Sequence, residues 1–255
     1  MKSKNRAPTS TPLVSVLMCA HNSATFIESA IQSILNQSYE NFELVIVENG
    51  STDDTFDIAS SFQDARIRIF RTSLKQLTFN LNFGLNHCRG KYIARMDSDD
   101  TAHPDRLRQQ VEFLETNSKI DFVGSYMATF GKHSTTLRYP ISHRGIVALS
   151  PFKTVMAHPT VIGKANAFLD CGGYHGLKFA EDLDFWLSSM RRGKRFANIP
   201  LELVNYRIHD DQARGKKEAY ASAAGTLLKH SLLTKNPIYL VGSFVGSLKF
   251  LIFGR

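Results

Sequence analysis

The chain of 255 residues can hold one large domain or two small ones, and its 43% hydrophobic content, with 18 phenylalanines, is ample for a packed core. A net charge of +8 indicates an acidic partner (anionic lipid, a phosphorylated substrate or nucleic acid), but the chain has no Lys/Arg block and no RNA-binding aromatic motif, which disfavours nucleic acid. The three cysteines are far apart and form no CxxC pair, which argues against a zinc site and predicts a reducing, cytosolic compartment.

The chain begins with residues 1–11, which are rich in Lys, Ser, Thr and Pro and contain no apolar stretch. We expect a disordered lead-in there, not a signal peptide. Strands and helices then alternate, which implies βαβ units and a largely parallel sheet. The expected strands cover residues 13–18, 43–47, 66–70 and 92–96, and the helices between them cover 26–35, 52–62 and 79–87. Thr25 and Glu28 are expected to form a capping box on the first helix, and Ser51 is the expected N-cap of the second.

The second half of the chain is less regular. It predicts a helix over residues 104–115, a strand over 120–123 and a turn at Gly172-Gly173-Tyr174. A helix with acidic residues in its first turn and apolar residues after them follows from Glu181 towards Arg191. Because no internal repeat and no convincing linker is present, this half is expected to belong to the same domain.

Three polar clusters follow expected strands: residues 19–22, 48–51 and 97–100. Ligands of parallel α/β sheets bind beyond the carboxyl ends of the strands. The clusters therefore indicate a site at one edge of the sheet, although the ordinary polarity of loops explains part of the pattern.

The cluster at residues 97–100 contains three carboxylates within four positions. In extended backbone, residues i and i+2 point to the same side, so Asp97 and Asp99 should converge while Asp100 points elsewhere. Such charge density needs a cation or several donors, and hard oxygen ligands favour Mg²⁺ or Mn²⁺. On this pattern alone, a solvated acidic turn is the preferred interpretation.

Five segments in this order resemble the nucleotide-sugar-dependent glycosyltransferases of family 2. They are residues 14–22, 45–53, 89–100, 104–107, and 172–174 together with 181–182. The resemblance covers roughly residues 12–210 and implies an α/β fold of GT-A type, with a Rossmann-like, mostly parallel sheet flanked by helices and a C-terminal helical extension. The implied glycosyltransferase domain spans residues 12–215, with a nucleotide half over 12–105 and an acceptor half over 106–215. A helical segment over 216–255 follows it.

The resemblance implies a site for the nucleotide of a uridine diphosphate sugar, formed by Cys19, Ala20, His21, Asn22, Asn49 and Asp97. Family members usually have Thr and Tyr at the positions of Cys19 and His21. At the positions of Glu48 and Asn49 they usually have two Asp residues, the second of which recognises uracil. Asn49 offers both a donor and an acceptor, so uracil and another base both remain open. Local turn chemistry explains His21 or Asn49 alone equally well.

By the same resemblance, Asp97 contacts the ribose, Asp99 binds Mn²⁺ or Mg²⁺, and Asp182 is the general base that accepts the proton of the acceptor hydroxyl. Direct attack by that hydroxyl predicts inversion at the anomeric carbon. Favourable first-turn charge on a helix is the alternative explanation for Asp182, and the preferred one for Glu181 and Asp184. Further candidates are His209 for the metal or diphosphate, His158 near the acceptor, Arg95 for phosphate or for offsetting the acidic cluster, Asp100 behind the metal, and Glu181 beside the base.

Near the end of the chain, residues 241, 244, 245, 248 and 252 form an apolar face at helical spacing. The apolar run before Lys249 is too short to span a bilayer. One interpretation is an interfacial helix on an anionic membrane, and the other is a helix packed on the domain or in a dimer.

The resulting prediction is a cytoplasmic glycosyltransferase of hexosyltransferase type, peripheral at the inner face of the membrane. It is expected to transfer one sugar, with inversion and a metal, from a nucleoside diphosphate sugar (a UDP-sugar by the resemblance) to a glycan or lipid-linked glycan in surface polysaccharide or glycolipid biosynthesis. The chain has no Gln-x-x-Arg-Trp motif, which argues against processive synthesis. Two alternatives remain: a polyprenyl-phosphate sugar synthase, and a catalytically silent GT-A domain that binds glycan, anionic lipid or a partner enzyme.

Overall fold

The structure of the protein is a computed structural model that describes residues 12–131, 134–176, 178–208 and 217–253. The lead-in expected over residues 1–11 and the candidate His209 lie outside the described residues.

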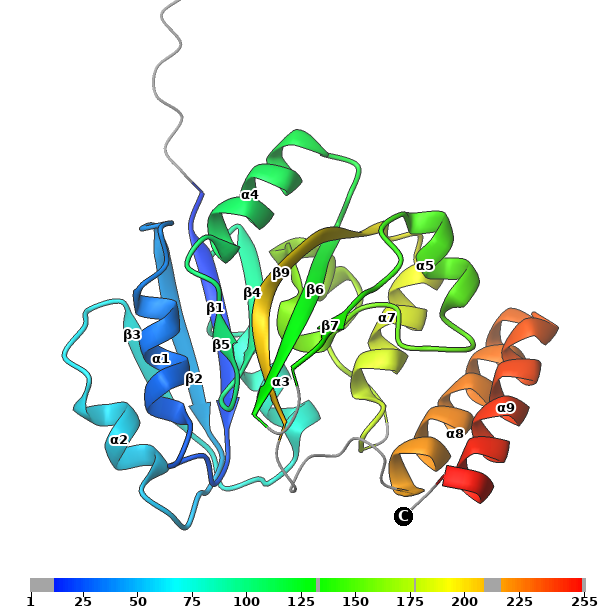
Figure 1. The fold of residues 1–255 in the computed structure, drawn as a ribbon, viewed down its shortest axis with the longest axis horizontal. Helices are drawn as coiled ribbons and strands as arrows, with labels where there is room; N and C mark the ends of the chain where they lie inside the picture. The colour runs from blue at the N-terminus through cyan, green and yellow to red at the C-terminus, as the bar shows by residue number, and fades with distance from the viewer. Residues whose placement is uncertain (1–11, 132–133, 177, 209–216, 254–255) are drawn as a thin grey trace, which may run out of the picture.

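Within the described residues, one sheet of nine strands forms the centre of the molecule (Figure 1). The strands are β1 (Val14–Ala20), β2 (Phe42–Glu48), β3 (Ile67–Arg71), β4 (Tyr92–Asp97), β5 (Thr101–Ala102), β6 (Phe122–Gly131), β7 (Thr136–Leu137), β8 (Ile162–Lys164) and β9 (Phe196–Ile208). Their order is β3-β2-β1-β4-β8-β6-β9-β5, and β7 pairs with β6 outside this path. β3, β2, β1 and β4 are parallel, as the sequence predicts. The short β8 is antiparallel to both β4 and β6, so β6 and β9 run in the direction of β4.

Helices cover both faces of the sheet. They are α1 (Ile27–Leu35), α2 (Thr55–Ser61), α3 (Leu77–Leu85), α4 (Arg106–Thr116), α5 (His143–Leu149), the 3₁₀ helix η1 (His158–Thr160), α6 (Ala165–Asp170), α7 (Glu181–Arg191), α8 (Lys217–Thr234) and α9 (Pro237–Phe253). Successive strand residues point to opposite faces. In β1, Met18 packs in the core formed with α1 and α4, whereas Leu17 packs in the core formed with α3 and α7. The inner strands are buried on both sides, and this explains their continuous apolar runs.

The helix starts differ from two predictions. No side-chain cap bond precedes α1, and the carbonyl of Ser23 instead accepts the N–H groups of Phe26 and Ile27, so the predicted capping box is wrong. α2 begins at Thr55, later than predicted, because the Ser51 hydroxyl accepts the N–H of Asn22 across the sheet edge and does not cap the helix.

The longest strand, β9, was not predicted. It contains Pro200, which cannot donate a ladder hydrogen bond and reads as a strand breaker. The register against β6 shows how the proline is accommodated. Ile199 pairs with Ser125 and Glu202 pairs with the next residue, Tyr126, so residues 200 and 201 form a bulge.

α8 and α9 form a hairpin at the side of the sheet opposite β3 (Figure 1). The hairpin packs against α7 through a small apolar cluster of Leu187, Leu227 and Tyr239. Within the part of the chain that the structure describes, no helix is both long and apolar enough to cross a membrane.

Candidate active site

The three polar clusters predicted from the sequence meet at one edge of the sheet. β1 pairs with β2 so that Ala20 lies opposite Glu48, and with β4 so that Cys19 lies opposite Asp97. The carboxyl ends of the three strands are therefore level with one another. Cys19 and Ala20 are the last, buried residues of β1, and burial raises the pKa of the Cys19 thiol to about 12.

Hydrogen bonds join the loop after β1 to the loop after β2. Nδ1 of His21 lies 3.1 Å from the carbonyl oxygen of Asn49. The N–H of Asn22 donates to the Ser51 hydroxyl at 3.0 Å, and the Asn22 side-chain oxygen accepts the N–H of Thr52 at 2.9 Å. These bonds hold Asn22 at φ 49°, in the left-handed region that asparagine tolerates better than most residues. His21 and Asn22 are exposed, so this paired turn is open to a ligand.

A second set of bonds reaches the loop after β4. The hydroxyls of Ser23 and Ser98 are 2.8 Å apart, and both residues are buried. The N–H of Ser23 also donates to the Thr55 hydroxyl at 2.7 Å. Ser23 therefore links all three loops, which makes the edge a preformed surface.

Glu48 and Asn49 have different surroundings. Burial raises the pKa of Glu48, but the N–H of Ser51 and the Arg71 guanidinium, which donate to its two oxygens, outweigh burial and lower the pKa below its ordinary value. Glu48 thus stabilises the turn as a buried, ion-paired carboxylate. Asn49 is also buried, but its Oδ1 has no hydrogen-bond partner among the described residues. An unsatisfied buried acceptor is unfavourable, so Asn49 is suited to an N–H donor of a ligand.

The carboxylates of Asp97, Asp99 and Asp100 form one cluster, with one oxygen of each within 4.8 Å of the others. The prediction that Asp100 points elsewhere is therefore wrong. The strand ends at Asp97, and the bend after it stops the alternation on which the prediction depended. Asp100 is fully buried. Its Oδ1 accepts the N–H of Arg207 at 2.9 Å, while its Oδ2 has no hydrogen-bond partner within the described ranges.

Two buried arginines, Arg95 and Arg106, bring positive charge to this cluster. The guanidinium of the buried Arg95 pairs with Asp97, so Arg95 offsets the acidic cluster. The buried Arg106 donates to the Arg95 carbonyl at 2.7 Å. Burial nevertheless raises the pKa of Asp97, and burial with the charges of Asp97 and Asp99 raises that of Asp100 well above its ordinary value. An all-oxygen set with an unpartnered buried carboxylate oxygen fits a hard divalent cation such as Mg²⁺ or Mn²⁺.

Arg207, near the end of β9, holds the acidic turn in place, a role that the sequence analysis missed. Its Nε donates to the carbonyl of Asp99 at 2.9 Å, in addition to its backbone bond to Asp100. The guanidinium carbon lies 4.8 Å from the ring centre of Phe26 and 4.5 Å from that of Phe130. The sequence signal was the segment Tyr206-Arg207-Ile208-His209, which resembles the late Arg/His segment of family 2 members.

The first turn of α7 contains two carboxylates that share the electrostatic environment of the acidic cluster. Burial raises the pKa of Glu181, to about 7, and that of Asp182, and the charges of Arg95 and Asp97 act on both. Asp182 is only partly accessible, and its Oδ1 accepts the N–H of Leu183 at 2.7 Å. Asp182 and Glu181 are therefore close enough to Arg95 and Asp97 for those charges to act on them.

Asp184, two residues after Asp182 on α7, is instead anchored by α8. It is 1% exposed, and its Oδ1 accepts hydrogen bonds from Nζ of Lys229 at 2.7 Å and Nε2 of His230 at 3.0 Å. Burial opposes ionisation, but these two donors outweigh it and lower the pKa of Asp184. This agrees with the structural role expected for Asp184.

His158 lies in the packed layer beside α7. Its Nε2 and the Tyr174 hydroxyl are hydrogen-bonded at 2.9 Å, and burial lowers the pKa of the imidazole well below its ordinary value, so the ring is neutral at pH 7. The backbone of Tyr174 is bonded at both its N–H and its carbonyl to the Asn82 side chain. The expected turn at Gly172 and Gly173 is present, with φ of 77° and 73°.

Comparison with known proteins finds glycosyltransferases by family, by relatives and by fold. Residues 15–174 match the family described as Glycosyl transferase family 2. The chain is 35% identical over 230 residues to the O-antigen biosynthesis glycosyltransferase WbnJ of Escherichia coli, covering 86% of this chain and 89% of WbnJ. It is also 35% identical over 221 residues to an uncharacterized glycosyltransferase of Haemophilus influenzae, covering 79% of this chain and 67% of that protein.

Two solved structures share the fold at 18% identity. S. aureus TarS 1-349 in complex with UDP-GlcNAc has a TM-score of 0.67, with 84% of this chain and 66% of the TarS chain covered. The mannosyltransferase PcManGT from Pyrobaculum calidifontis, in complex with GDP-Man and Mn²⁺, has a TM-score of 0.65, with 95% of this chain and 71% of PcManGT covered. These similarities confirm the α/β fold of GT-A type.

Proposed function

The chain belongs to glycosyl transferase family 2 and is a glycosyltransferase, and we propose that it transfers a single sugar from a nucleoside diphosphate sugar to a hydroxyl of a surface glycan, with inversion. One observation carries the proposal. A carboxylate cluster suited to a divalent cation and an open turn lie at the carboxyl edge of one sheet, and the charges of that edge act on the partly accessible carboxylate of Asp182 on α7. Sugar transfer needs all three: the turn for the nucleotide of the donor, the metal for the diphosphate leaving group, and the carboxylate for the acceptor hydroxyl.

On the donor side, Asp97, Asp99 and Asp100 would hold Mn²⁺ or Mg²⁺. When bound, this ion supplies positive charge to the diphosphate leaving group. The resemblance of the chain to PcManGT, whose structure contains GDP-Man and Mn²⁺, supports the use of a metal.

Asn49 and the turn at His21 and Asn22 would hold the base. The buried Oδ1 of Asn49 suits a ring N–H, which uracil and guanine both present. The fold neighbours contain either UDP-GlcNAc or GDP-Man. We propose a UDP-sugar as the donor, with the paired turn contacting the base.

On the acceptor side, Asp182 would accept the proton of the attacking hydroxyl. As the oxygen forms its bond to the anomeric carbon, the bond from that carbon to the diphosphate oxygen breaks and the nucleoside diphosphate leaves. Burial raises the pKa of Asp182 towards the working pH, which makes the carboxylate a better proton acceptor than an exposed aspartate. Direct displacement on the face opposite the leaving group inverts the anomeric configuration.

The acceptor class is proposed from the relative WbnJ, whose name assigns it to O-antigen biosynthesis. By this similarity, the acceptor is a growing surface glycan, free or carried on a lipid. We propose that the reaction takes place on the cytoplasmic side of the membrane.

The test is calorimetric titration with UDP and with GDP, in Mn²⁺ and then in a chelator. We expect metal-dependent binding of UDP by the wild type and at least about tenfold weaker binding by Asp99→Ala, because one of the three clustered carboxylates is lost. Asp170→Ala, which removes an exposed carboxylate that pairs with Lys194, is the matched control and should bind like the wild type.

Preference for GDP would refute the uridine assignment. Binding of neither nucleotide by the folded protein would contradict the transferase mechanism and favour the silent GT-A domain.

A further inference from the structure

The last helix, α9, turns most of its large apolar side chains outward and, Tyr239 apart, packs small residues inward. Phe244 is 71% exposed and Leu251 75% exposed. The buried face has residues that allow close approach. A Cβ on Gly242 would lie 2.3 Å from the Pro151 carbonyl oxygen, and the Ser243 hydroxyl donates to the Ala224 carbonyl at 2.8 Å. A surface helix of a water-soluble protein has the opposite arrangement, with its apolar face towards the core.

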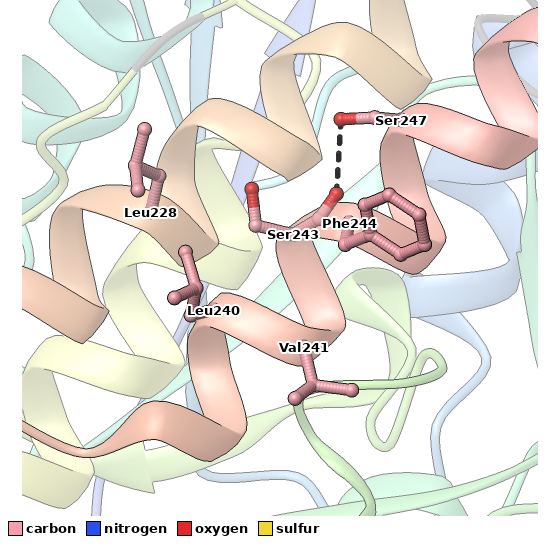
Figure 2. A pocket seen from close by; sticks show the side chains of 6 residues that line it. All are labelled: Leu228, Leu240, Val241, Ser243, Phe244 and Ser247. Carbon is pink, nitrogen blue, oxygen red and sulfur yellow. Dashed lines mark hydrogen bonds between the residues drawn. The ribbon is translucent and has the colours of Figure 1, made fainter.

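The apolar surface continues onto α8. Ten of the fifteen large hydrophobic residues that are exposed within the described residues belong to this hairpin. They are Leu228, Leu232, Leu233, Ile238, Leu240, Val241, Phe244, Leu248, Leu251 and Ile252. Figure 2 shows part of this surface, where Leu228, Leu240 and Phe244 surround a shallow hollow. Single exposed hydrophobic residues are ordinary, but a contiguous group marks a binding surface.

The charges of the hairpin are mostly positive: α8 begins with Lys217 and Glu218, and no further Asp or Glu follows in either helix. Residues 219–253 contain Lys229, Lys235 and Lys249 and no Asp or Glu. Lys229 is bonded to the buried Asp184, and Nζ of Lys249 donates to the Phe152 carbonyl at 3.4 Å. Lys217 at the start of α8 and Lys235 between the helices are exposed. The surface is therefore apolar and cationic.

The combination of apolar side chains and lysines favours one of the two possible binding partners of this surface, a second copy of the chain or a lipid bilayer. In a symmetric dimer through this surface, each copy would present the same patch to the other, and the lysines of both copies would lie in one interface and repel. An anionic bilayer instead offers hydrocarbon to the apolar side chains and negative headgroups to the lysines, whose long aliphatic stems can reach the headgroups from the rim. α9 has 17 residues, and at ~1.5 Å per residue it is about 25 Å long, which is shorter than the hydrocarbon core.

We propose that the hairpin of α8 and α9 lies flat on an anionic lipid bilayer, with the outward face of α9 inserted at the level of the headgroups. The proposal also explains why Gly242 and Gly246 face Pro151 and Ala224. Close packing on the domain keeps the apolar face of α9 turned outward.

The placement has a consequence for the active site, and this part rests on the proposed function. The beginning of α7 and of α8, the end of α9 and the carboxyl ends of β1 and β2 lie at the same end of the molecule (Figure 1). Asp184 bonds the first turn of α7 to α8. A hairpin seated on the bilayer would therefore hold Asp182 near the membrane surface, where a lipid-linked acceptor is presented.

A tryptophan reporter tests the docking without any measurement of activity. Trp186, the single tryptophan, is 2% exposed and gives a constant background, so Phe244→Trp supplies a new signal on the proposed contact face. We expect a blue shift of emission with vesicles containing phosphatidylglycerol, and quenching by lipids brominated near the headgroup. Pure phosphatidylcholine vesicles should give a much smaller effect that high salt does not change.

Vesicle flotation of the full chain gives the quantitative test. The double substitution Phe244→Ser with Leu251→Ser should weaken binding to anionic vesicles at least about tenfold, since each change removes several carbons that would be buried in the bilayer. Leu169→Ser is the matched control, because Leu169 is 60% exposed on α6, outside the hairpin, and should bind like the wild type.

Equal binding to neutral and anionic vesicles, or no binding to either, would overturn the proposal. A dimer in light scattering that the double substitution dissociates, without vesicle binding, would assign the surface to a second copy. Nucleotide titration of the double variant separates this proposal from the proposed function, because the donor site should be unchanged whichever way the vesicle experiment turns out.

Discussion

Replacing Asp182 with asparagine removes the proposed general base and changes little else in the structure. The Asp182 oxygen that accepts the Leu183 N–H at 2.7 Å can be replaced by the amide oxygen of asparagine. An amide does not accept a proton at neutral pH. We therefore expect kcat to fall by ~10²–10⁴, the usual contribution of a positioned base, with nucleotide affinity unchanged.

The effect on stability has a predictable sign. Because burial raises the pKa of Asp182, the folded protein binds this proton more tightly than the unfolded chain does, and the contribution of this group to stability decreases as the pH rises through the raised pKa. At neutral pH the buried carboxylate is therefore destabilising. Asp182→Asn should leave the melting temperature unchanged or raise it. In the wild type, activity should fall as the pH is lowered through the raised pKa, because the protonated base is inactive.

Asp184→Asn is the matched control on the same helix, with the opposite expectation. Two donors lower the pKa of Asp184, so its carboxylate stabilises the fold above the unfolded pKa of about 3.9, and this stability is lost as the pH falls through the lowered pKa. Breaking a fully buried ion pair by removing one partner lowers the unfolding free energy by about 3–5 kcal/mol. Lys229 is half exposed and can turn to water, so we expect a loss of about 1–3 kcal/mol of unfolding free energy, with kcat within tenfold of the wild type.

The assay measures kcat and KM for sugar transfer at saturating donor, together with thermal unfolding of both variants. Transfer by Asp182→Asn within tenfold of the wild type would refute the general base. It would favour the polyprenyl-phosphate sugar synthase, whose lipid phosphate acceptor needs no proton removed. An unchanged melting temperature for Asp184→Asn would show that the bonds to α8 do not stabilise the fold.

Two further predictions concern the support of the site. Arg207→Met removes the bond to the Asp99 carbonyl and the two ring contacts. A charge-assisted hydrogen bond contributes about 1.5–3 kcal/mol, so we expect metal-dependent nucleotide binding, measured by calorimetry, to be at least about tenfold weaker. Unchanged affinity would mean that the acidic turn keeps its shape without Arg207. Gly90→Ala should destabilise the protein by about 2–4 kcal/mol in denaturant unfolding, because its Cβ would lie 2.6–2.8 Å from three backbone atoms where β1 and β4 begin. Gly145 lies inside α5, and its Cβ would meet only side-chain atoms, at 3.3 Å, so Gly145→Ala should be neutral or stabilising. Similar losses of unfolding free energy for both substitutions would contradict the explanation by close backbone approach.

The first half of the fold and the place of the site could be predicted from the sequence alone. Apolar periodicity is a local property, and the runs that form β1, β2 and β4 are buried on both faces and hence continuous. Once these strands are parallel, their carboxyl ends must share an edge, which brings the loops of His21, Asn49 and Asp97 together. The order of the motifs along the chain was sufficient to indicate the family.

Contacts between residues far apart in the chain decided the rest. Asp100 joins the acidic cluster because the strand ends before it and because Arg207, over a hundred residues later, binds it. The hydroxyl of Ser51 serves Asn22 in a neighbouring loop, so a local capping rule failed. β9 contains Pro200 because its bulge against β6 removes the need for a ladder hydrogen bond. The direction of the apolar face of α9 depended on which side could approach Pro151 and Ala224 most closely. Hydrophobic periodicity predicts that a helix has an apolar face, but only packing between distant segments determines whether that face contacts the core or lies at the surface.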